Sequence, residues 1–257
     1  MNNRLSVTIL GSGTCVPSLA RSACALLMET GGQKAVFDCG PGTMRRLLEA
    51  GVTVFDLTHL FLSHFHPDHT GELVSLLFAN KYTLPPQRTA SLTLAGGKGL
   101  ADFYNGLRGV FGEWIELGDD LLRFKEFAAD GEDYYRHETF SVTTRPVAHR
   151  PESVAYRVTV DDCAMVYSGD TDVNENLIRL SQDADLLICE SALPDELKAE
   201  GHLTPSLAGE IARRAGVKRL VLTHFYPACD KVDIVQQCAR TYGGEIILAE
   251  DLMRIEL

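Results

Sequence analysis

The sequence predicts an α/β fold, and two observations support this prediction. Short apolar runs typical of buried strands alternate with segments of helical spacing throughout the 257 residues. Histidines and carboxylates recur directly after the predicted strands, at the strand ends where α/β sheets place their sites. Since no long linker, low-complexity segment or repeat of fixed period interrupts the pattern, we expect one compact domain over residues 1–257.

Glycine and proline set the boundaries of the predicted elements. Gly31 and Gly32 mark a hairpin between two strands. Gly51 ends the first helix, and Pro205 occupies the favoured first turn of a later helix that Gly216 ends. In chain order, the first part is predicted to contain strand 5–10, strands 23–29 and 34–38, helix 43–50, strand 58–63, helix 70–80, strand 91–95, helix 98–110, one or two strands within 114–127, a polar loop at 130–137 and strand 138–147. The remainder is predicted to contain a hairpin of strands 154–160 and 163–168, helix 174–180, strand 186–189, helix 204–215, strand 218–222, helix 232–241 and closing strands 245–248 and 252–255.

The strongest motif directly follows the apolar strand at 58–63. His64, His66, Asp68 and His69 place three imidazoles and one carboxylate within six positions. His64 and His66 point to the same side of an extended chain, and one turn can gather all four groups. A lone histidine usually caps a helix or lies in a core, but four such groups packed together without a metal would be costly to desolvate. A mixed imidazole and carboxylate set suits a hydrolytic metal pair.

Further potential ligands follow later strands. His149, Asp170 and His224 each come after a predicted strand, and Glu190 ends another. Taken alone, each is a weak signal, because loop and strand-end polar residues are common. In this order behind the first motif, we interpret His149, Asp170 and His224 as further metal ligands.

Composition limits the classes of partner. The formal net charge of −11 argues against a large nucleic acid partner, since such proteins usually present a basic surface. The seven cysteines never form C-x-x-C, which favours free thiols in a reducing compartment. No apolar stretch approaches the length of about 20 residues that a membrane span needs, and no signal peptide is recognisable. We therefore expect a cytoplasmic protein that does not interact with a membrane.

The four donor segments together resemble the metallo-β-lactamase superfamily, over nearly the whole chain. The resemblance implies a four-layer αββα sandwich and two divalent metal ions, with zinc as the default and manganese or iron as alternatives. It implies that His64, His66 and His149 hold one metal, that Asp68, His69 and His224 hold the other, and that Asp170 bridges them.

Within the superfamily, the second half resembles the ribonuclease Z branch and its phosphodiesterase relatives. Glu190, the Gly201–Thr204 segment with His202, and Thr223-His224 match that branch. The resemblance implies that His202 donates a proton to the leaving alkoxide and that Glu190 orients it. The alternative is that Glu190 is a surface carboxylate and that His202 only precedes a helix.

The chain differs from ribonuclease Z in the part that binds tRNA. Ribonuclease Z carries a long arm that grips tRNA between the third-motif histidine and the bridging aspartate, whereas His149 and Asp170 are only 21 positions apart. The chain thus resembles the core hydrolase without the tRNA-gripping arm. The resemblance also leaves room for a homodimer.

These observations support a dinuclear-metal hydrolase, with a metal-bridging hydroxide attacking a small or nucleotide-like phosphodiester. Asp68, His202 and Glu190 are the expected catalytic residues. Three alternatives stay open: a ribonuclease Z-type tRNA 3′-endonuclease, a lactonase or thioesterase, and a metal-binding protein without turnover. The sequence does not identify the substrate.

Overall fold

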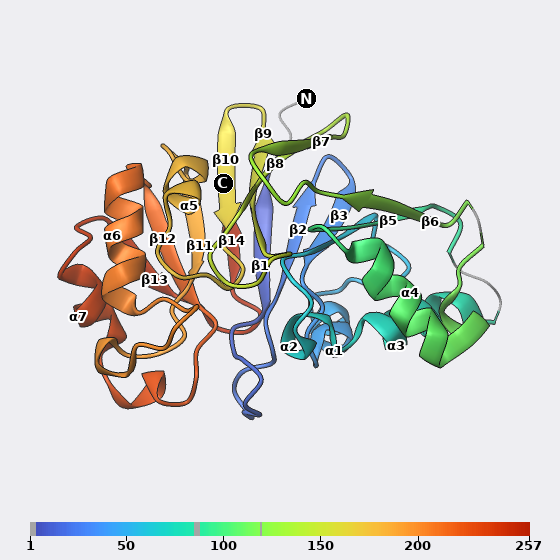
Figure 1. The fold of residues 1–257 in the computed structure, drawn as a ribbon, viewed down its shortest axis with the longest axis horizontal. Helices are drawn as coiled ribbons and strands as arrows, with labels where there is room; N and C mark the ends of the chain where they lie inside the picture. The colour runs from blue at the N-terminus through green and yellow to red at the C-terminus, as the bar shows by residue number, and fades with distance from the viewer. Residues whose placement is uncertain (1–3, 85–87, 119) are drawn as a thin grey trace.

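The computed structural model describes residues 4–84, 88–118 and 120–257, which form two seven-stranded sheets packed face to face (Figure 1). The first sheet has the order β14-β1-β2-β3-β4-β5-β6. Its strands β3 to β6 are parallel, whereas β14, β1, β2 and β3 pair antiparallel. The bounds are β1 (Ser6–Gly11), β2 (Ala25–Thr30), β3 (Gln33–Phe37), β4 (His59–Leu62), β5 (Leu92–Gly96), β6 (Leu122–Glu126) and β14 (Arg254–Glu256).

The second sheet has the order β13-β12-β11-β10-β9-β8-β7. Its strands β10 to β13 are parallel, and β7 to β10 pair antiparallel. Consequently β8, β10, β11 and β12 all run in the same direction and end at the same edge. The bounds are β7 (Asp133–Arg136), β8 (Ser141–Pro146), β9 (Val154–Val160), β10 (Cys163–Tyr167), β11 (Leu186–Glu190), β12 (Arg219–Thr223) and β13 (Glu245–Leu248).

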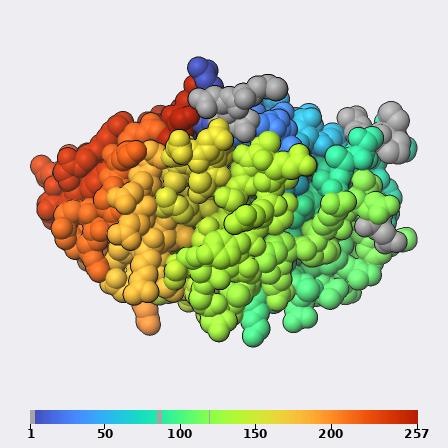
Figure 2. All heavy atoms as spheres, turned by 90° about the horizontal axis from the view of Figure 1, so that it is seen from above, coloured from blue at the N-terminus to red at the C-terminus, as the bar shows by residue number. Residues whose placement is uncertain are grey.

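Helices cover the outer face of each sheet and complete the αββα sandwich (Figure 1). The first sheet carries α1 (Thr43–Glu49), α2 (Pro67–Thr70), α3 (Leu73–Tyr82) and α4 (Leu100–Phe111), followed by the 3-10 turn η1 (Gly112–Ile115). The second carries α5 (Glu175–Leu180), α6 (Pro205–Ala215) and α7 (Ile234–Ala239), with 3-10 turns η2 (Asp195–Leu197) and η3 (Cys229–Lys231). In the space-filling view, the α3–α4 region and the C-terminal segments occupy opposite ends of the molecule (Figure 2). The predicted sandwich is therefore confirmed.

Apolar side chains fill the spaces between the layers. Phe37 and Phe61 of the first sheet stack on each other at 4.9 Å and pack against Tyr156 of the second, with ring centroids 5.4 and 5.5 Å away. A second cluster, which includes Leu47 and Leu76, lies between the first sheet and its helices. Burial of this extent holds the strand ends in fixed positions, which is what a site at those ends requires.

Two local predictions need correction. The polar loop expected at 130–137 contains strand β7, an edge strand whose residues are half-buried or exposed, so its polar composition hides it. Helix 70–80 divides into the one-turn helix α2 and the separate helix α3. The prediction of one or two strands within 114–127 is confirmed by β6, whereas Trp114 lies in a 3-10 turn and Asp119 lies outside the described residues.

Of the helices formed by the described residues, none combines the length and apolar character that crossing a membrane would demand.

Candidate metal centre

The predicted site residues meet where the two sheets present their strand ends. His149 follows β8, Asp170 follows β10, and His224 follows β12, three strands that run in one direction. His64 to His69 follow β4 of the other sheet. Each sheet therefore contributes part of the donor set, because parallel strands end at a common edge.

The turn after β4 concentrates four donors in a short segment. His66 is the N-cap of α2 and Pro67 is its first residue, a position where the missing N–H costs nothing. The turn carries His69 inward, where its side chain is fully buried. Extended chain followed at once by one helical turn thus brings Asp68 and His69 next to His64 and His66, as the spacing predicts.

The first donor group consists of His64, His66, His149 and Asp170. Each offers one ligand atom, and these atoms all lie within 4.8 Å of one another. His149 Nε2 is 3.2 Å from His66 Nδ1, and His64 Nε2 is 3.7 Å from Asp170 Oδ2. Such spacing allows one cation to contact all four residues.

The second donor group consists of Asp68, His69 and His224, also within 4.8 Å of one another. Asp170 Oδ1 lies 3.2 Å from His69 Nε2 and 3.3 Å from His224 Nε2. Asp170 therefore turns one carboxylate oxygen to each donor group. A carboxylate placed in this way can offer one oxygen to a cation in each donor group.

Two buried atoms test whether these residues fit a metal. His64 Nε2 and Asp170 Oδ1 are inaccessible to solvent and have no hydrogen-bond partner among the described residues. Buried polar atoms are almost always paired, so two unpaired ones facing the donor groups call for a cation. The donor chemistry agrees, since imidazole and carboxylate together suit zinc and similar divalent ions.

Electrostatics keeps the carboxylates of the centre ionised. Burial alone would raise the pKa of Asp170, but His224 and His69 outweigh it and hold that pKa well below its ordinary value. The pKa of Asp68 is likewise lowered, because His224 and His69 outweigh its burial. Burial holds the pKa of His64 well below its ordinary value, so this imidazole stays neutral, the form that binds metal.

Asp38 is a functional residue that sequence reasoning missed. It follows β3, is fully buried, and its Oδ2 lies 2.7 Å from His69 Nδ1. Since a carboxylate only accepts, His69 donates from Nδ1 and directs Nε2 toward the second donor group. Asp38 also accepts from Ser63 N and Oγ and from the Tyr167 hydroxyl. In the sequence, Asp38 is only an aspartate that ends the strand predicted at 34–38, with no local feature that marks it as part of the site.

Two glycines with left-handed backbone conformation lie next to two of the donors, His149 and Asp170. Gly201 has φ of +80°, and its carbonyl accepts from His149 Nδ1 at 2.9 Å, which leaves His149 Nε2 for the first donor group. Gly169 precedes Asp170 with φ of +55°, and a Cβ there would meet Ser63 Cβ at 2.6 Å. Because any other residue would be strained at these positions, the glycines help to fix the donors.

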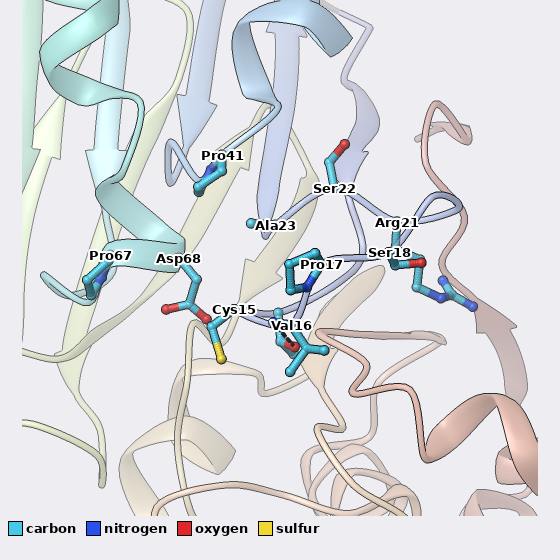
Figure 3. A pocket seen from close by; sticks show the side chains of 11 residues that line it. Cys15, Val16, Pro17, Ser18, Arg21, Ser22, Ala23, Pro41, Pro67 and Asp68 are labelled. Atoms are coloured by element: carbon cyan, nitrogen blue, oxygen red, sulfur yellow. Dashed lines mark hydrogen bonds between the residues drawn. The ribbon is translucent and has the colours of Figure 1, made fainter.

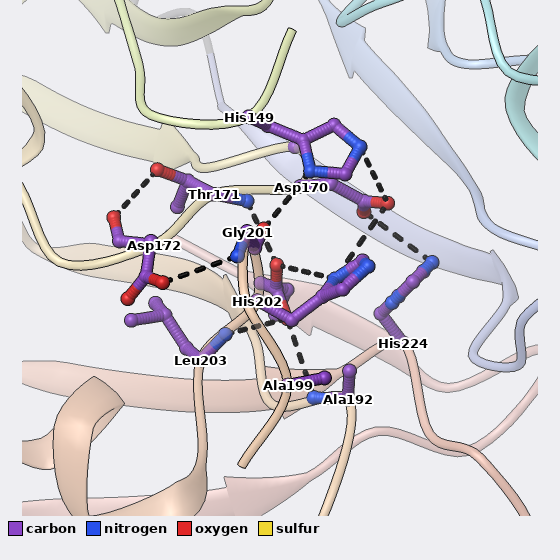
Figure 4. A network of polar contacts seen from close by, with 12 residues as sticks. His149, Asp170, Thr171, Asp172, Ala192, Ala199, Gly201, His202, Leu203 and His224 are labelled. Atoms are coloured by element: carbon purple, nitrogen blue, oxygen red, sulfur yellow. Dashed lines mark hydrogen bonds and ion pairs between the residues drawn. The ribbon is translucent and has the colours of Figure 1, made fainter.

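Glu190 and the half-buried His202 form a hydrogen-bonded pair. Figure 4 shows His202 beside His149, Asp170 and His224. Glu190 is 1% exposed, so its interpretation as a surface carboxylate is wrong. Its Oε1 accepts from His202 Nδ1 at 3.0 Å and from Thr171 N at 2.7 Å, and its Oε2 accepts from Leu203 N at 3.1 Å. His202 Nδ1 is 4.0 Å from Asp170 Oδ2. Burial lowers the pKa of His202, but Glu190 outweighs this and the net shift is upward.

Comparison with known proteins gives consistent matches over the length of the chain. The family model described as Anti-Pycsar protein Apyc1 matches residues 5–230. Ribonuclease Z of Methanothermobacter thermautotrophicus is 27% identical over 309 residues, which cover 98% of this chain and 97% of that protein. The crystal structure of human tRNase Z, short form, is 28% identical, with a TM-score of 0.78 over 97% of this chain and 98% of that one.

A further solved structure bears on the fold alone. The metallo-β-lactamase fold protein YhfI from Bacillus subtilis is 23% identical, with a TM-score of 0.84 over 99% of this chain and 100% of that one. The fold inferred from the histidine motif is thereby confirmed.

Proposed function

The chain belongs to the Anti-Pycsar protein Apyc1 family, within the ribonuclease Z-like branch of the metallo-β-lactamase superfamily, and is therefore a metal-dependent hydrolase. We propose that its substrate is a small or nucleotide-like phosphodiester. The observation that supports this substrate class is the pair of Glu190 and His202. A positioned histidine beside the donor groups suits a reaction whose alkoxide leaving group needs a proton.

We assign the ligands of two divalent ions. His64, His66 and His149 would hold one, Asp68, His69 and His224 would hold the other, and Asp170 would bridge them. Zinc fits these donors, and manganese or iron are the alternatives. When bound, the ions would supply Lewis-acid stabilisation of the phosphate charge and a water of lowered pKa.

The side chains of the centre then move two protons. Asp68, ionised and at the edge of the second donor group, accepts a proton from the attacking water. As the water oxygen bonds to phosphorus, the ester P–O bond breaks and its electron pair goes to the leaving oxygen. His202, whose Nδ1 is held by Glu190, gives the leaving oxygen the proton of its other ring nitrogen, Nε2.

Replacement of His202 by Ala tests this assignment. A 3′,5′-cyclic nucleotide has a sugar alkoxide as its leaving group, and we expect its kcat to fall by a factor of about 10² to 10⁴. Hydrolysis of bis(p-nitrophenyl) phosphate should fall far less, because nitrophenolate leaves without a proton. His137→Ala, a histidine outside the donor groups, serves as the control and should change neither rate. Equal losses on both substrates in the His202 variant would contradict a proton-donor role.

A tRNA 3′-endonuclease is the second candidate function, because the ribonuclease Z and tRNase Z relatives match the full chain. Against it, the 309-residue alignment exceeds the 257 residues of this chain, so that relative has residues this chain lacks. The hairpin of β9 and β10 also fills the span between His149 and Asp170. We therefore propose that large nucleic acids are not the substrate. Salt-dependent, efficient cleavage of a pre-tRNA would reverse this choice.

A further inference from the structure

The loop at 198–204 joins η2 to α6 and carries His202 to the donor groups (Figure 4). It contains no regular secondary structure, so the hydrogen bonds of a sheet or helix do not hold His202 in place. Glu190 fixes the end of the loop by accepting from His202 Nδ1 and from Leu203 N. A second carboxylate, that of Asp172, contacts the beginning of the loop and belongs to neither donor group. The role of this second carboxylate therefore lies in the loop.

Asp172 binds the loop through one carboxylate oxygen. Its Oδ2 accepts from Gly201 N at 3.1 Å and from Lys198 Nζ at 2.7 Å. Its Oδ1 accepts from Val173 N at 2.8 Å, and its own backbone N donates to the Ala148 carbonyl at 2.8 Å. Because the backbone and the other oxygen of Asp172 are both held, Oδ2 has a defined position from which it fixes the loop.

A series of hydrogen bonds continues from this contact to His149 of the first donor group. Lys198 Nζ donates to the Ala199 carbonyl at 2.6 Å, and the same carbonyl accepts from His202 N at 3.3 Å. The peptide group that contains this N–H also contains the Gly201 carbonyl, which accepts from His149 Nδ1 at 2.9 Å. Hydrogen bonds in such a series polarise one another, so the ion pair strengthens the contact that directs His149 Nε2 to the first donor group.

The close packing around Gly201 makes its position critical. A Cβ at Gly201 would lie 3.0 Å from His149 Nδ1, so the loop and the imidazole are already in tight contact. A displacement of Gly201 therefore moves the acceptor of His149 and the attached backbone of His202 together. The Asp172 and Lys198 side chains are 30% and 33% exposed, and an ion pair of that exposure contributes little to overall stability. Its effect is instead on the geometry of the centre.

We propose that Asp172 is a positioning residue that holds two imidazoles in place through Gly201. One belongs to His149, and the other belongs to His202. The His202 part of this role rests on the proposed phosphodiesterase function, whereas the His149 part requires only metal binding. None of the described residues that line the cavity of about 390 Å³ beside Asp68 belongs to this network (Figure 3). Loss of the Asp172 carboxylate leaves those walls unchanged, so it should lower kcat and metal affinity more than it changes KM.

Asp172→Ala, assayed with saturating zinc, tests the part that concerns His202. We expect kcat for a 3′,5′-cyclic nucleotide to fall about tenfold, because a displaced proton donor is misaligned with the leaving oxygen. Hydrolysis of bis(p-nitrophenyl) phosphate, whose leaving group needs no proton, should fall far less. In a His202→Ala background, Asp172→Ala should cause no further loss on the cyclic nucleotide. Asp172→Asn keeps an oxygen acceptor for Gly201 N and should restore most of the rate.

Calorimetric titration of the metal-free protein with zinc tests the part that concerns His149, without any reaction. We expect Asp172→Ala to weaken zinc binding about tenfold, since residues that orient a metal ligand from outside typically have effects of this size. Lys198→Ala leaves the bond to Gly201 N intact and should weaken zinc binding about threefold, in line with the small energy of an exposed ion pair. This variant changes only a surface side chain, so it decides the question if Asp172→Ala does not fold.

Asp185→Ala is the matched control. Asp185 accepts from Lys218 Nζ at 2.7 Å and from Ala164 N at 2.8 Å, and thus also binds one lysine and one backbone N–H. It precedes β11, however, at the opposite end of that strand from Glu190. The control variant should therefore change neither the two rates nor the zinc affinity.

The outcomes separate the positioning role from the proposed function. Equal effects of Asp172→Ala and Asp185→Ala on the rates and on zinc affinity would overturn the positioning role. A further loss on the cyclic nucleotide in the His202→Ala background would overturn its His202 part. If the unmodified protein hydrolyses neither phosphodiester, the proposed function fails. A selective loss of zinc affinity in Asp172→Ala then still supports the His149 part, and unchanged affinity overturns it.

Discussion

At the scale of single residues, His59 is a buried histidine outside the donor groups. It begins β4, is 3% exposed and packs against the ring of Phe61. Its Nε2 lies 2.8 Å from the Tyr135 hydroxyl, and the ring of His137 lies 5.5 Å from its own ring. Burial, with a smaller contribution from His137, lowers the pKa of His59 to about 4. The folded protein therefore holds this imidazole neutral over the mildly acidic range.

The low pKa of His59 predicts an acid-sensitive contribution to stability. In the unfolded chain the pKa is about 6.5, so between pH 6.5 and 4 the unfolded state binds a proton that the folded state excludes. The contribution is fully present above pH 6.5 and is lost as the pH falls, by about 2 kcal/mol between pH 7 and 5.

His59→Phe keeps a ring at this position and cannot titrate. We expect the free energy of unfolding of the unmodified protein, measured with denaturant at pH 7 and 5, to decrease more than that of the variant. All other titrating groups are present in both proteins, so subtracting the variant's decrease between pH 7 and 5 from that of the unmodified protein leaves the contribution of His59. If the decreases are the same, His59 does not hold the low pKa.

The residues of the site also show how far sequence reasoning reaches. The donors after β4, β8, β10 and β12 could be predicted, because metal ligands are few in type and fall at strand ends. Asp38 was not predicted as part of the site, since an aspartate after a strand has no distinguishing local signal. Its role depends on Ser63, His69 and Tyr167, which meet it only in the folded structure.

At the scale of elements, helix α1 depends on a carboxylate from outside its own sequence. Gly42 occupies its N-cap with φ of +103° and has no side chain to accept from the first backbone N–H groups. Glu72, which precedes α3, accepts from Gly42 N at 2.8 Å and from Met44 N at 2.6 Å. The helix start thus receives both hydrogen bonds and a favourable negative charge.

Glu72→Ala should therefore destabilise the protein by about 1 to 2 kcal/mol, the typical cost of losing a helix cap. The measurement is the shift in the thermal midpoint, followed by circular dichroism. Glu49→Ala is the control, because Glu49 lies in the same helix and pairs with Arg45 and Arg46 at the surface. Its loss should shift the thermal midpoint far less, because surface ion pairs contribute little to stability. Equal shifts in the two variants would contradict the capping role.

Prediction of the elements succeeded where burial produces an apolar run and failed at polar edges. Strands β4 and β11 are buried throughout, β12 is buried from Leu220 onward, and all three stand out in the sequence. Strand β7 exposes Tyr134 and Arg136 to solvent, and its polar residues resemble a loop until β8 pairs with it. The strand pairing is a long-range property that local patterns do not contain.

At the scale of the whole molecule, the centre joins two sheets that are distant in sequence. Hydrogen bonds already cross between them: the Tyr156 hydroxyl donates to the Leu62 carbonyl, and the Tyr167 hydroxyl donates to Asp38, both at 2.6 Å. These bonds fix the position of the segment from His64 to His69 relative to the second sheet. Local sequence patterns could indicate that the donors meet, but the division into two sheets followed from the family resemblance.

Because the donors come from both sheets, metal binding should stabilise the fold as a whole. A ligand that binds only the folded state adds stability that grows with its concentration, by about 4 kcal/mol at a thousand times Kd. We expect a chelator to lower the thermal midpoint and zinc to restore it in a concentration-dependent manner. Asp170→Asn should lose most of this rise, since Asp170 faces both donor groups at 3.2 to 3.7 Å. Asp162→Asn, an exposed aspartate in the β9–β10 turn, should keep the full rise. A rise of the same size in the Asp170 variant would show that metal acts elsewhere than between the two sheets.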